Sequence, residues 1–200
     1  MLAKNCQIEV YAGKLRRRSE ENCRHAQGDR TSLSDFEVID IVNASAFSLA
    51  KEMGLWLNFH DIAKLGVPFP SGVENEVYLS KDGNTVYKIN NLMLSPSVLD
   101  LLDRLILHNS IFPQTRYELY GFTGFGGNST YPILSQDYIK DVTFSSPLEI
   151  NCYMESLGFL ETGEARFSNG DIEISDLYPR NVLKDINGDI YVIDANYKIL

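Results

Sequence analysis

The sequence contains few cysteines, few histidines and no long apolar run. Its 200 residues include three cysteines with no C-x-x-C pair, and three histidines that are scattered along the chain. This composition predicts free thiols in a reducing compartment and supports neither a disulfide framework nor a zinc site. No apolar stretch approaches the roughly 20 residues that cross a bilayer. The first 14 residues also lack the continuous apolar segment of a secretory signal. We therefore expect no membrane association.

The chain does contain enough apolar residues for a folded domain. Hydrophobic residues make up 44% and aromatic residues 11% of the sequence, as in globular rather than disordered proteins. This length suits one domain, or one domain with an extension.

Charge is unevenly distributed along the chain. Residues 1–34 hold seven Lys or Arg against four Asp or Glu, including the run KLRRR at 14–18, whereas the rest hold 11 against 23. The net charge is therefore +3 for the first segment and −12 for the remainder. A folded part this acidic is a poor candidate for direct nucleic-acid binding. The basic segment could contact nucleic acid or a partner, but we interpret it as a short solvated tail.

The first two segments differ in periodicity. Residues 1–34 are polar with little periodicity, which predicts a basic extension that is flexible or loosely packed. Residues 35–64 contain apolar side chains at helical spacing, among them Phe47 and Met53. We expect one or two helices here, packed on the domain that follows, with Gly54 ending the first of them.

The segment 65–140 is typical of strands with one helix. Asp82-Gly83 lies between two alternating runs, which is a hairpin signal. Residues 95–112 form the clearest helical pattern, which Ser97 can cap. Two further strands are expected around the loop GFGGNS.

The segment 141–200 is expected to hold a helix at 147–159, a loop and a short hairpin at Asn187-Gly188. The whole chain is therefore predicted to be an α+β protein with its sheet in the first half. No internal repeat is visible.

Two features of the first half could carry chemistry. The turn PSGVENEV at 70–77 contains Gly72, which permits close backbone approach, and Asn75, which tolerates positive φ. An ordinary hairpin turn has the same composition. Lys88, in TVYKIN, is expected to share a strand face with the apolar Val86. A lysine at a strand end that extends its ammonium group into water would give the same pattern.

Three polar residues stand out near the end of the sequence. Asp176 and Asn181 lie five positions apart in ISDLYPRN, and Asp194 ends the strand that follows the Asn187-Gly188 turn. Each is common in turns or at strand ends. Phosphoryl transfer from ATP, however, needs a cation for the phosphates, ligands for Mg²⁺ and a carboxylate near the acceptor hydroxyl. Together with Lys88, these residues provide one group for each requirement.

These motifs resemble those of the protein-kinase superfamily. PSGVENEV is similar to the glycine-rich loop G-x-G-x-x-G-x-V: it keeps Gly72 and Val77 and has Pro70 and Asn75 in place of two glycines. TVYK resembles V-A-I-K and implies that Lys88 binds the phosphates.

The later motifs resemble the catalytic and metal-binding loops of the same superfamily. ISDLYPRN is similar to H-R-D-L-x-x-x-N, which implies that Asp176 is the catalytic base and Asn181 a metal ligand. In the sequence DAN, Asp194 takes the place of the metal-binding aspartate of D-F-G.

The resemblance also implies an adenine site. ILSQDYI is similar to the strand before the kinase hinge, which places Gln136 near the gatekeeper and Asp137 to Ile139 at the adenine edge. Leu183 would lie below the adenine, with Val77 and Val86 above it.

Over roughly residues 44–200 the sequence more narrowly resembles the small kinase-like domain found in polyvalent proteins of phages and conjugative elements. This resemblance implies a cytoplasmic protein with serine, threonine or tyrosine kinase activity that uses ATP and Mg²⁺. The acceptor, a protein or a small molecule, is left open. The implied fold is kinase-like, with an antiparallel N-terminal sheet and one helix, followed by a reduced helical C-terminal lobe.

The sequence departs from the superfamily pattern at several positions. Ile174-Ser175 replaces the His-Arg pair before the catalytic aspartate, and Ala195-Asn196 replaces the Phe-Gly of D-F-G. The glutamate that would pair with Lys88 has no clear match, and the nearest carboxylates are Asp100 and Asp103.

Only six residues follow Asp194, so the sequence predicts no peptide-binding activation segment. Three hypotheses remain open. The chain is a compact ATP-dependent phosphotransferase, a non-catalytic kinase-like module that binds a nucleotide or a partner, or an α+β domain in which the motifs are coincidental.

Overall fold

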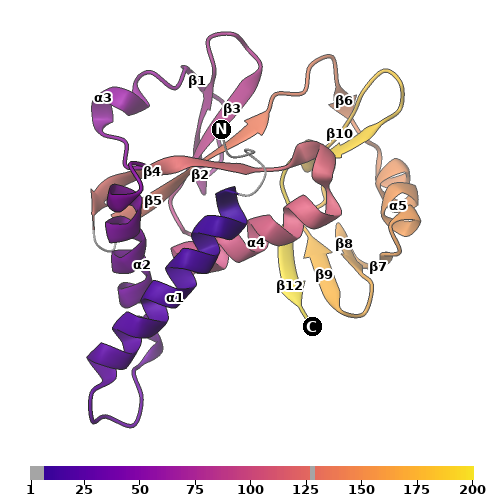
Figure 1. Ribbon diagram of the computed structural model, residues 1–200. Coiled ribbons are helices and arrows are strands. Elements are labelled where there is room, and N and C mark those ends of the chain that lie inside the picture. Colours follow the sequence, from indigo (N-terminus) through magenta and orange to yellow (C-terminus); the bar gives the residue numbers. More distant parts are fainter. Residues whose placement is uncertain (1–6, 127–128) are drawn as a thin grey trace. The chain divides into compact units, whose positions relative to one another are not determined.

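A computed structural model describes residues 7–126 and 129–200 and divides them into two compact units. Unit 1 contains the residues up to Ile106 together with Tyr117–Tyr138, and unit 2 contains Leu107–Arg116 together with Ile139–Leu200. The described residues form five α-helices and several antiparallel sheets (Figure 1). The predicted mixture of helices with antiparallel strands is therefore confirmed. Part of the loop GFGGNS, residues 127–128, lies outside the described residues.

Unit 1 is built on a five-stranded antiparallel sheet in the order β1-β2-β3-β5-β4. Its elements are α1 (Gln7–Gln27), α2 (Asp35–Glu52), α3 (Phe59–Ile62), β1 (Val67–Phe69), β2 (Asn75–Leu79), β3 (Thr85–Asn90), the first part of α4 (Val98–Ile111), β4 (Glu118–Gly126) and β5 (Ser129–Asp137). The expected hairpin is formed by β2 and β3, and Gly83 in its turn adopts a φ of +67° that favours glycine.

The basic N-terminal segment is not loosely packed, which corrects the expectation from its composition. It forms α1, a 21-residue helix that packs beside α2 (Figure 1). One face of α1 is buried in the main core of unit 1, where Tyr11 and Leu15 are fully buried. The Tyr11 hydroxyl donates to the carbonyl oxygen of Ala46 in α2 (2.7 Å), and burial raises the pKa of this phenol. The apolar stripe at Ile8, Tyr11 and Leu15 has helical spacing, but the KLRRR charges obscured it.

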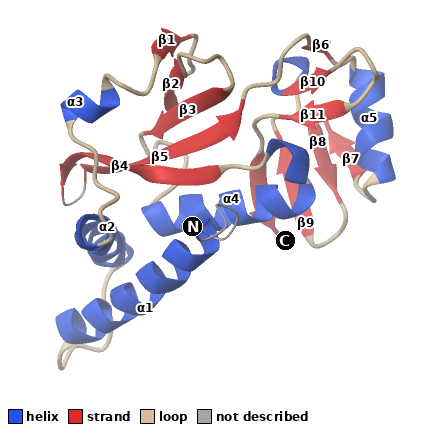
Figure 2. Ribbon diagram, turned by 45° about the horizontal axis from the view of Figure 1, so that its top comes forward, coloured by secondary structure: helices blue, strands red, loops and turns tan. Residues whose placement is uncertain are grey.

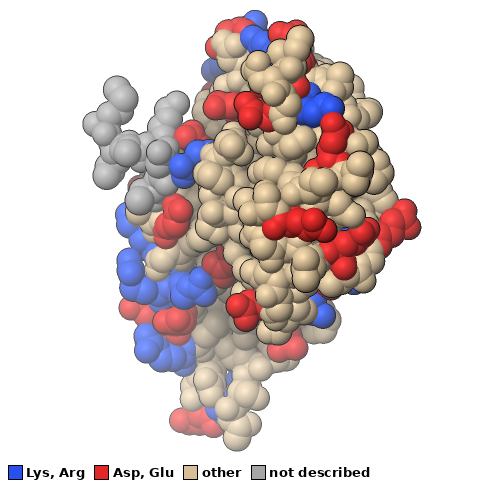
Figure 3. All heavy atoms as spheres, turned by 90° about the vertical axis from the view of Figure 1, so that its right-hand side faces the viewer, with Lys and Arg blue, Asp and Glu red and all other residues tan. Residues whose placement is uncertain are grey.

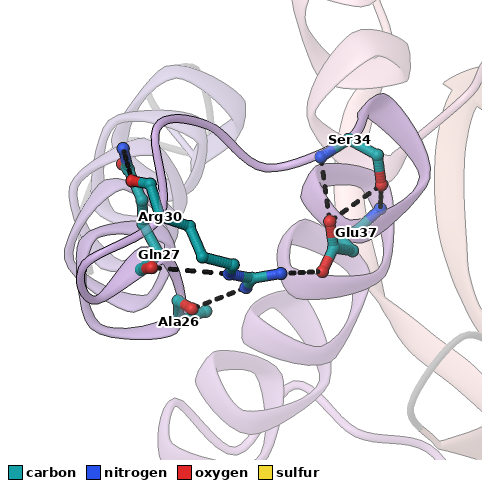
Figure 4. A network of polar contacts seen from close by, with 5 residues as sticks. All are labelled: Ala26, Gln27, Arg30, Ser34 and Glu37. Carbon is teal, nitrogen blue, oxygen red and sulfur yellow. Dashed lines mark hydrogen bonds and ion pairs between the residues drawn. The ribbon is translucent and has the colours of Figure 1, made fainter.

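The turn between α1 and α2 is fixed by a polar network (Figure 4). Arg30 donates to the carboxylate of Glu37 (2.8 Å) and to the carbonyl oxygen of Ala26 (2.7 Å). Ser34 and Glu37 form a reciprocal capping box at the start of α2. These bonds from Ser34 and Arg30 lower the pKa of Glu37 to about 2. The helix ends at Glu52, and Gly54 follows at a φ of +67°, as its position in the sequence predicted.

Helix α4 begins as its cap predicted and is bound to α1. The Asp100 backbone N–H donates to the Ser97 hydroxyl (3.3 Å), and that hydroxyl donates to the Asp100 carboxylate (2.6 Å). Further along the helix, Arg16 of α1 donates to both carboxylate oxygens of Asp103 (2.8 and 3.1 Å). Both carboxylates that the sequence offered as partners for Lys88 therefore have other partners.

Unit 2 is richer in strands than the expected reduced helical lobe (Figure 2). Its elements are the end of α4, η2 (Pro113–Thr115), β6 (Thr143–Phe144), α5 (Pro147–Ser156), β7 (Leu160–Gly163), β8 (Arg166–Ser168), β9 (Ile172–Ser175), η3 (Pro179–Asn181), β10 (Val182–Lys184), β11 (Ile190–Val192) and β12 (Asn196–Ile199). The strands form a three-stranded sheet, β11-β10-β6, and a four-stranded sheet, β12-β9-β8-β7. The expectation that the sheet is confined to the first half is wrong.

The core of unit 2 lies between these two sheets and α5. It contains the fully buried side chains of Met154, Ile174 and Val182, among others. A buried histidine, His108, contacts the hydroxyl of Tyr197 in β12 through Nδ1 (2.7 Å) and the carbonyl oxygen of Thr115 through Nε2 (3.1 Å). The last turn of α4 is thereby bound to β12. None of the described helices is long and apolar enough to span a membrane.

Candidate functional site

In unit 1, the turn before β2 is fixed by the end of β3. The Asn91 side chain donates to the carbonyl oxygen of Val73 (2.7 Å), and the Asn91 backbone N–H donates to that of Glu74 (3.0 Å). Gly72 lies in this turn and is exposed, with open space where a Cβ would lie. Local packing therefore does not require glycine there, and any requirement would come from a ligand.

A carboxylate lies in the same turn and is neutralised locally. The Glu74 side chain is only 12% exposed and lies 3.7 Å from the guanidinium of Arg104 on α4. It also accepts a hydrogen bond from the Asn90 side-chain nitrogen (3.1 Å). A buried carboxylate is stable only when it is paired and hydrogen-bonded, and Arg104 and Asn90 provide both. No local pattern indicates this group, because its three residues lie far apart along the chain.

The ammonium group of Lys88 contacts the side chain of Tyr117. Its ammonium nitrogen donates to the hydroxyl of Tyr117 (2.9 Å) and lies 4.7 Å from the centre of the same ring. Tyr117 is 5% exposed and belongs to the main core of unit 1, so its position is well defined.

The expected adenine-binding valines share a sheet face with Lys88. Lys88 is directly opposite Val77 on one neighbouring strand and Leu134 on the other, and Val86 is two residues away on the same strand. Directly opposed residues, and residues two apart, project from the same face of a sheet. Val77, Val86 and Lys88 are all half-buried.

The segment expected to contact the edge of the adenine, Asp137 to Ile139, contains the boundary between the two units along the sequence. Asp137 is the last residue of β5 and is exposed, whereas Gln136, next to it, is buried. Tyr138 is fixed to the β2–β3 turn by a bond from its N–H to the Asn84 carbonyl oxygen (2.9 Å). Ile139 is the first residue of this stretch in unit 2 and is half-buried.

In unit 2, the candidate base and the candidate metal-binding asparagine are in direct contact. The Asn181 side-chain nitrogen donates to the Asp176 carboxylate (2.8 Å) and to the Asp176 backbone carbonyl oxygen (2.8 Å). Asp176 follows β9 directly and adopts a φ of +65°, a left-handed conformation that few residues other than glycine adopt. The contacts with Asn181 hold it in this conformation.

Asp194 is brought to the same end of unit 2 by two strand pairings. The β10–β11 ladder is extended by a bond from the Ile193 N–H to the Asn181 carbonyl oxygen (2.9 Å). On the other side of Asp194, Asn196 is directly opposite Ser175, the residue before Asp176. The chain on one side of Asp194 is therefore paired with Asn181, and the chain on its other side is paired with the neighbour of Asp176.

These groups suit Mg²⁺. Both hydrogen atoms of the Asn181 amide are directed at Asp176, which leaves its carbonyl oxygen as the group available to a cation. This oxygen and the Asp194 carboxylate are the two groups that would hold such a cation. Mg²⁺ is usually bound by one or two such protein groups plus substrate phosphates, rather than by a complete protein cage. Within the described ranges, no group of three or more His, Cys, Asp or Glu residues is placed to hold a metal ion.

Leu183 lies on the face of β10 that is turned away from the core of unit 2. Its neighbour Val182 is fully buried in the core of unit 2, so Leu183 points to the opposite face of β10 and is half-buried. It is two residues from Asn181.

Arg180 is a residue at this site that the sequence did not single out. Its guanidinium donates to the second oxygen of the Asp176 carboxylate (2.6 Å) and lies 4.5 Å from the ring centre of Tyr178. Within ISDLYPRN, Arg180 lies four positions after Asp176, but on irregular backbone this spacing does not predict a contact. The Asp176 carboxylate is therefore oriented by both Arg180 and Asn181.

Comparison with known protein families gives one match. Residues 43–200 match the family model described as Serine/Threonine/Tyrosine Kinase found in polyvalent proteins. The matched range begins in α2 and includes every candidate site residue, but it leaves out α1. No curated protein matches the chain.

Proposed function

The chain belongs to the serine/threonine/tyrosine kinase family found in polyvalent proteins, and we propose that it transfers the γ-phosphate of ATP to a hydroxyl acceptor. The observation that best supports this activity is the contact of Asn181 with Asp176 next to the Asp194 backbone. In this contact the candidate base meets one candidate metal ligand, Asn181, whose backbone is paired with Ile193, the residue before Asp194. Phosphoryl transfer depends mainly on such positioning and on charge neutralisation.

In unit 1, we assign binding of the nucleotide to one face of the sheet. The Lys88 ammonium group, oriented by Tyr117, would contact the phosphates, and the turn that contains Gly72 would cover them. Val77 and Val86 would contact the adenine from this face. Asp137 and Ile139 would contact its polar edge through their backbone groups.

In unit 2, Asp176 would orient the acceptor hydroxyl and accept its proton. Arg180 donates to one oxygen of the Asp176 carboxylate and Asn181 donates to the other. Each oxygen keeps a further lone pair that can accept a hydrogen bond from a hydroxyl group. The Asn181 carbonyl oxygen and the Asp194 carboxylate would hold Mg²⁺, and Leu183 would contact the adenine. When bound, Mg²⁺ would supply neutralisation of the charge on the phosphates.

The test is Mg²⁺-dependent formation of ADP and labelled product from γ-labelled ATP. The acceptors would be the protein itself, casein, and a tyrosine-containing random copolymer. We expect activity in the wild type and in the control Asp171→Asn, which changes an exposed carboxylate of unit 2. Asp176→Asn should lower the rate by about 100-fold or more, because general-base catalysis contributes about 10²–10⁴-fold.

One result would overturn the catalytic part of this proposal. If the wild type binds ATP with Mg²⁺ but forms no ADP with any acceptor, the chain is a non-catalytic nucleotide-binding module. Equal rates for the wild type and Asp176→Asn would exclude the role assigned to Asp176.

A further inference from the structure

A small cavity in unit 2 adjoins the segment that follows Asp176. Its volume is about 150 Å³, and it is formed by α5, the β7–β8 turn and the residues just before Asn181. Most of its lining is apolar: Pro147, Ile150, Ala165, Phe167, Leu177 and Pro179. An apolar protein cavity of about this size can hold a benzene molecule. The cavity therefore fits one apolar side chain of the size of leucine or phenylalanine, and no complete nucleotide.

Carboxylates line the mouth of this cavity. Glu161 and Glu164 are exposed residues that line it, and the Asn151 side chain donates to Glu161 (2.9 Å). Figure 3 shows this side of unit 2, where acidic side chains are spread over the surface. An apolar cavity with an acidic mouth is complementary to an apolar residue whose neighbours are basic.

A series of contacts links the residues that line the cavity to Asp176. The Leu177 backbone N–H donates to the Ala165 carbonyl oxygen (3.2 Å), which fixes the β7–β8 turn to the segment after Asp176. Tyr178 lines the cavity, and its ring lies 4.5 Å from the Arg180 guanidinium. Arg180 in turn donates to the Asp176 carboxylate (2.6 Å).

The distance from this cavity to Asp176 limits where the bound residue can lie in an acceptor. Pro179, in the cavity wall, is three residues from Asp176, so their Cα atoms are at most about 11 Å apart at 3.8 Å per residue. An extended peptide covers about 3.3 Å per residue. The bound side chain would therefore be within about four residues of the acceptor hydroxyl.

We propose that this cavity binds an apolar side chain of a peptide acceptor, within about four residues of the phosphorylated residue and flanked by Lys or Arg. The proposal rests on the proposed function, because it assumes that Asp176 orients an acceptor hydroxyl. It names a substrate class: a protein segment that is basic and contains one exposed large apolar residue.

The test is binding of fluorescein-labelled 13-residue peptides, measured by fluorescence anisotropy without nucleotide. Two parent peptides carry one serine, with a leucine three residues before or after it and an arginine on each side of the leucine. For each parent, one variant replaces leucine by serine and another replaces both arginines by glutamate. The protein variants are the double change Glu161→Lys with Glu164→Lys, the cavity-filling Ala165→Leu, and the control Glu155→Lys on the exposed side of α5.

We expect at least one parent to bind the wild type, with about tenfold weaker binding when its leucine is replaced. The double lysine variant should bind this parent about fivefold or more weakly, and should bind the glutamate peptide better than the wild type does. Ala165→Leu should bind the parent peptide about tenfold more weakly than the wild type does. Glu155→Lys should change the affinity for this peptide less than twofold. Thermal unfolding of each variant checks that it is folded.

Equal binding of the parent and leucine-replaced peptides, or unchanged binding to a folded Ala165→Leu variant, would overturn the proposal. A thermal shift with ATP and Mg²⁺, measured on the same samples, separates the two proposals. A nucleotide shift without peptide discrimination rejects the acceptor cavity alone. Peptide discrimination without a nucleotide shift rejects the assigned nucleotide site alone.

Discussion

Helix α1 is expected to be an integral part of unit 1, and Leu15→Ala tests this. Leu15 is fully buried among the side chains of the main core, between α1, α2 and the sheet. Truncation of such a leucine to alanine costs about 3–5 kcal/mol, from lost transfer energy and the cavity that remains. A domain is stable by only about 5–15 kcal/mol in total, so the change should be large.

The assay is urea unfolding followed by tryptophan fluorescence. The single tryptophan, Trp56, lies in unit 1 and packs against Phe47 at 4.8 Å between ring centres, so it reports on this unit. With an m-value of about 2 kcal/mol/M, the urea midpoint of Leu15→Ala should fall by about 1.5–2.5 M. Val10→Ala is the control, because Val10 is on the same helix and 47% exposed. If both variants shift the midpoint equally and by less than about 0.5 M, α1 is not packed as described.

Three further predictions concern single polar contacts. Tyr117→Phe removes the hydrogen bond to Lys88 and should weaken ATP binding about three- to tenfold by calorimetry; unchanged affinity would refute an orienting role. Arg104→Gln removes the ion-pair partner of the Glu74 carboxylate in the turn that we propose covers the phosphates, so ATP binding should weaken, and a second change, Glu74→Gln, should restore it. Glu37, whose pKa is lowered to about 2, should stabilise unit 1 above about pH 4.5 and lose this effect as the pH falls towards 2. The difference in urea midpoint between the wild type and Glu37→Gln should therefore be larger at pH 6 than at pH 3, and a constant difference would contradict the assigned pKa.

Local sequence patterns predicted the elements whose signals lie within a few residues. The Asp82-Gly83 turn predicted the β2–β3 hairpin, and Ser97 with its neighbours predicted the start of α4. Motif spacing also drew attention to Asp176 and Asn181, between which the structure records a side-chain contact.

Features that depend on packing between distant segments could not be predicted in this way. The four-stranded sheet of unit 2 is made of strands of three or four residues, too short to show a clear alternation. The pairing of Lys88 with Tyr117 joins residues 29 positions apart, and nothing local in the sequence indicates it. The burial of α1 was missed because basic residues lie beside its apolar stripe.

The central proposal is that ATP binds together with Mg²⁺, and that Asn181 and Asp194 of unit 2 hold the metal ion. Its most direct test is calorimetric titration of ATP with Mg²⁺ present and with Mg²⁺ chelated, into the wild type, Asp194→Asn and the control Asp171→Asn. We predict Mg²⁺-dependent binding to the wild type and the control, weakened about tenfold or more in Asp194→Asn because a carboxylate ligand is lost. No binding to the wild type at millimolar ATP, or equal Mg²⁺-dependent binding to Asp194→Asn, would contradict the assigned site.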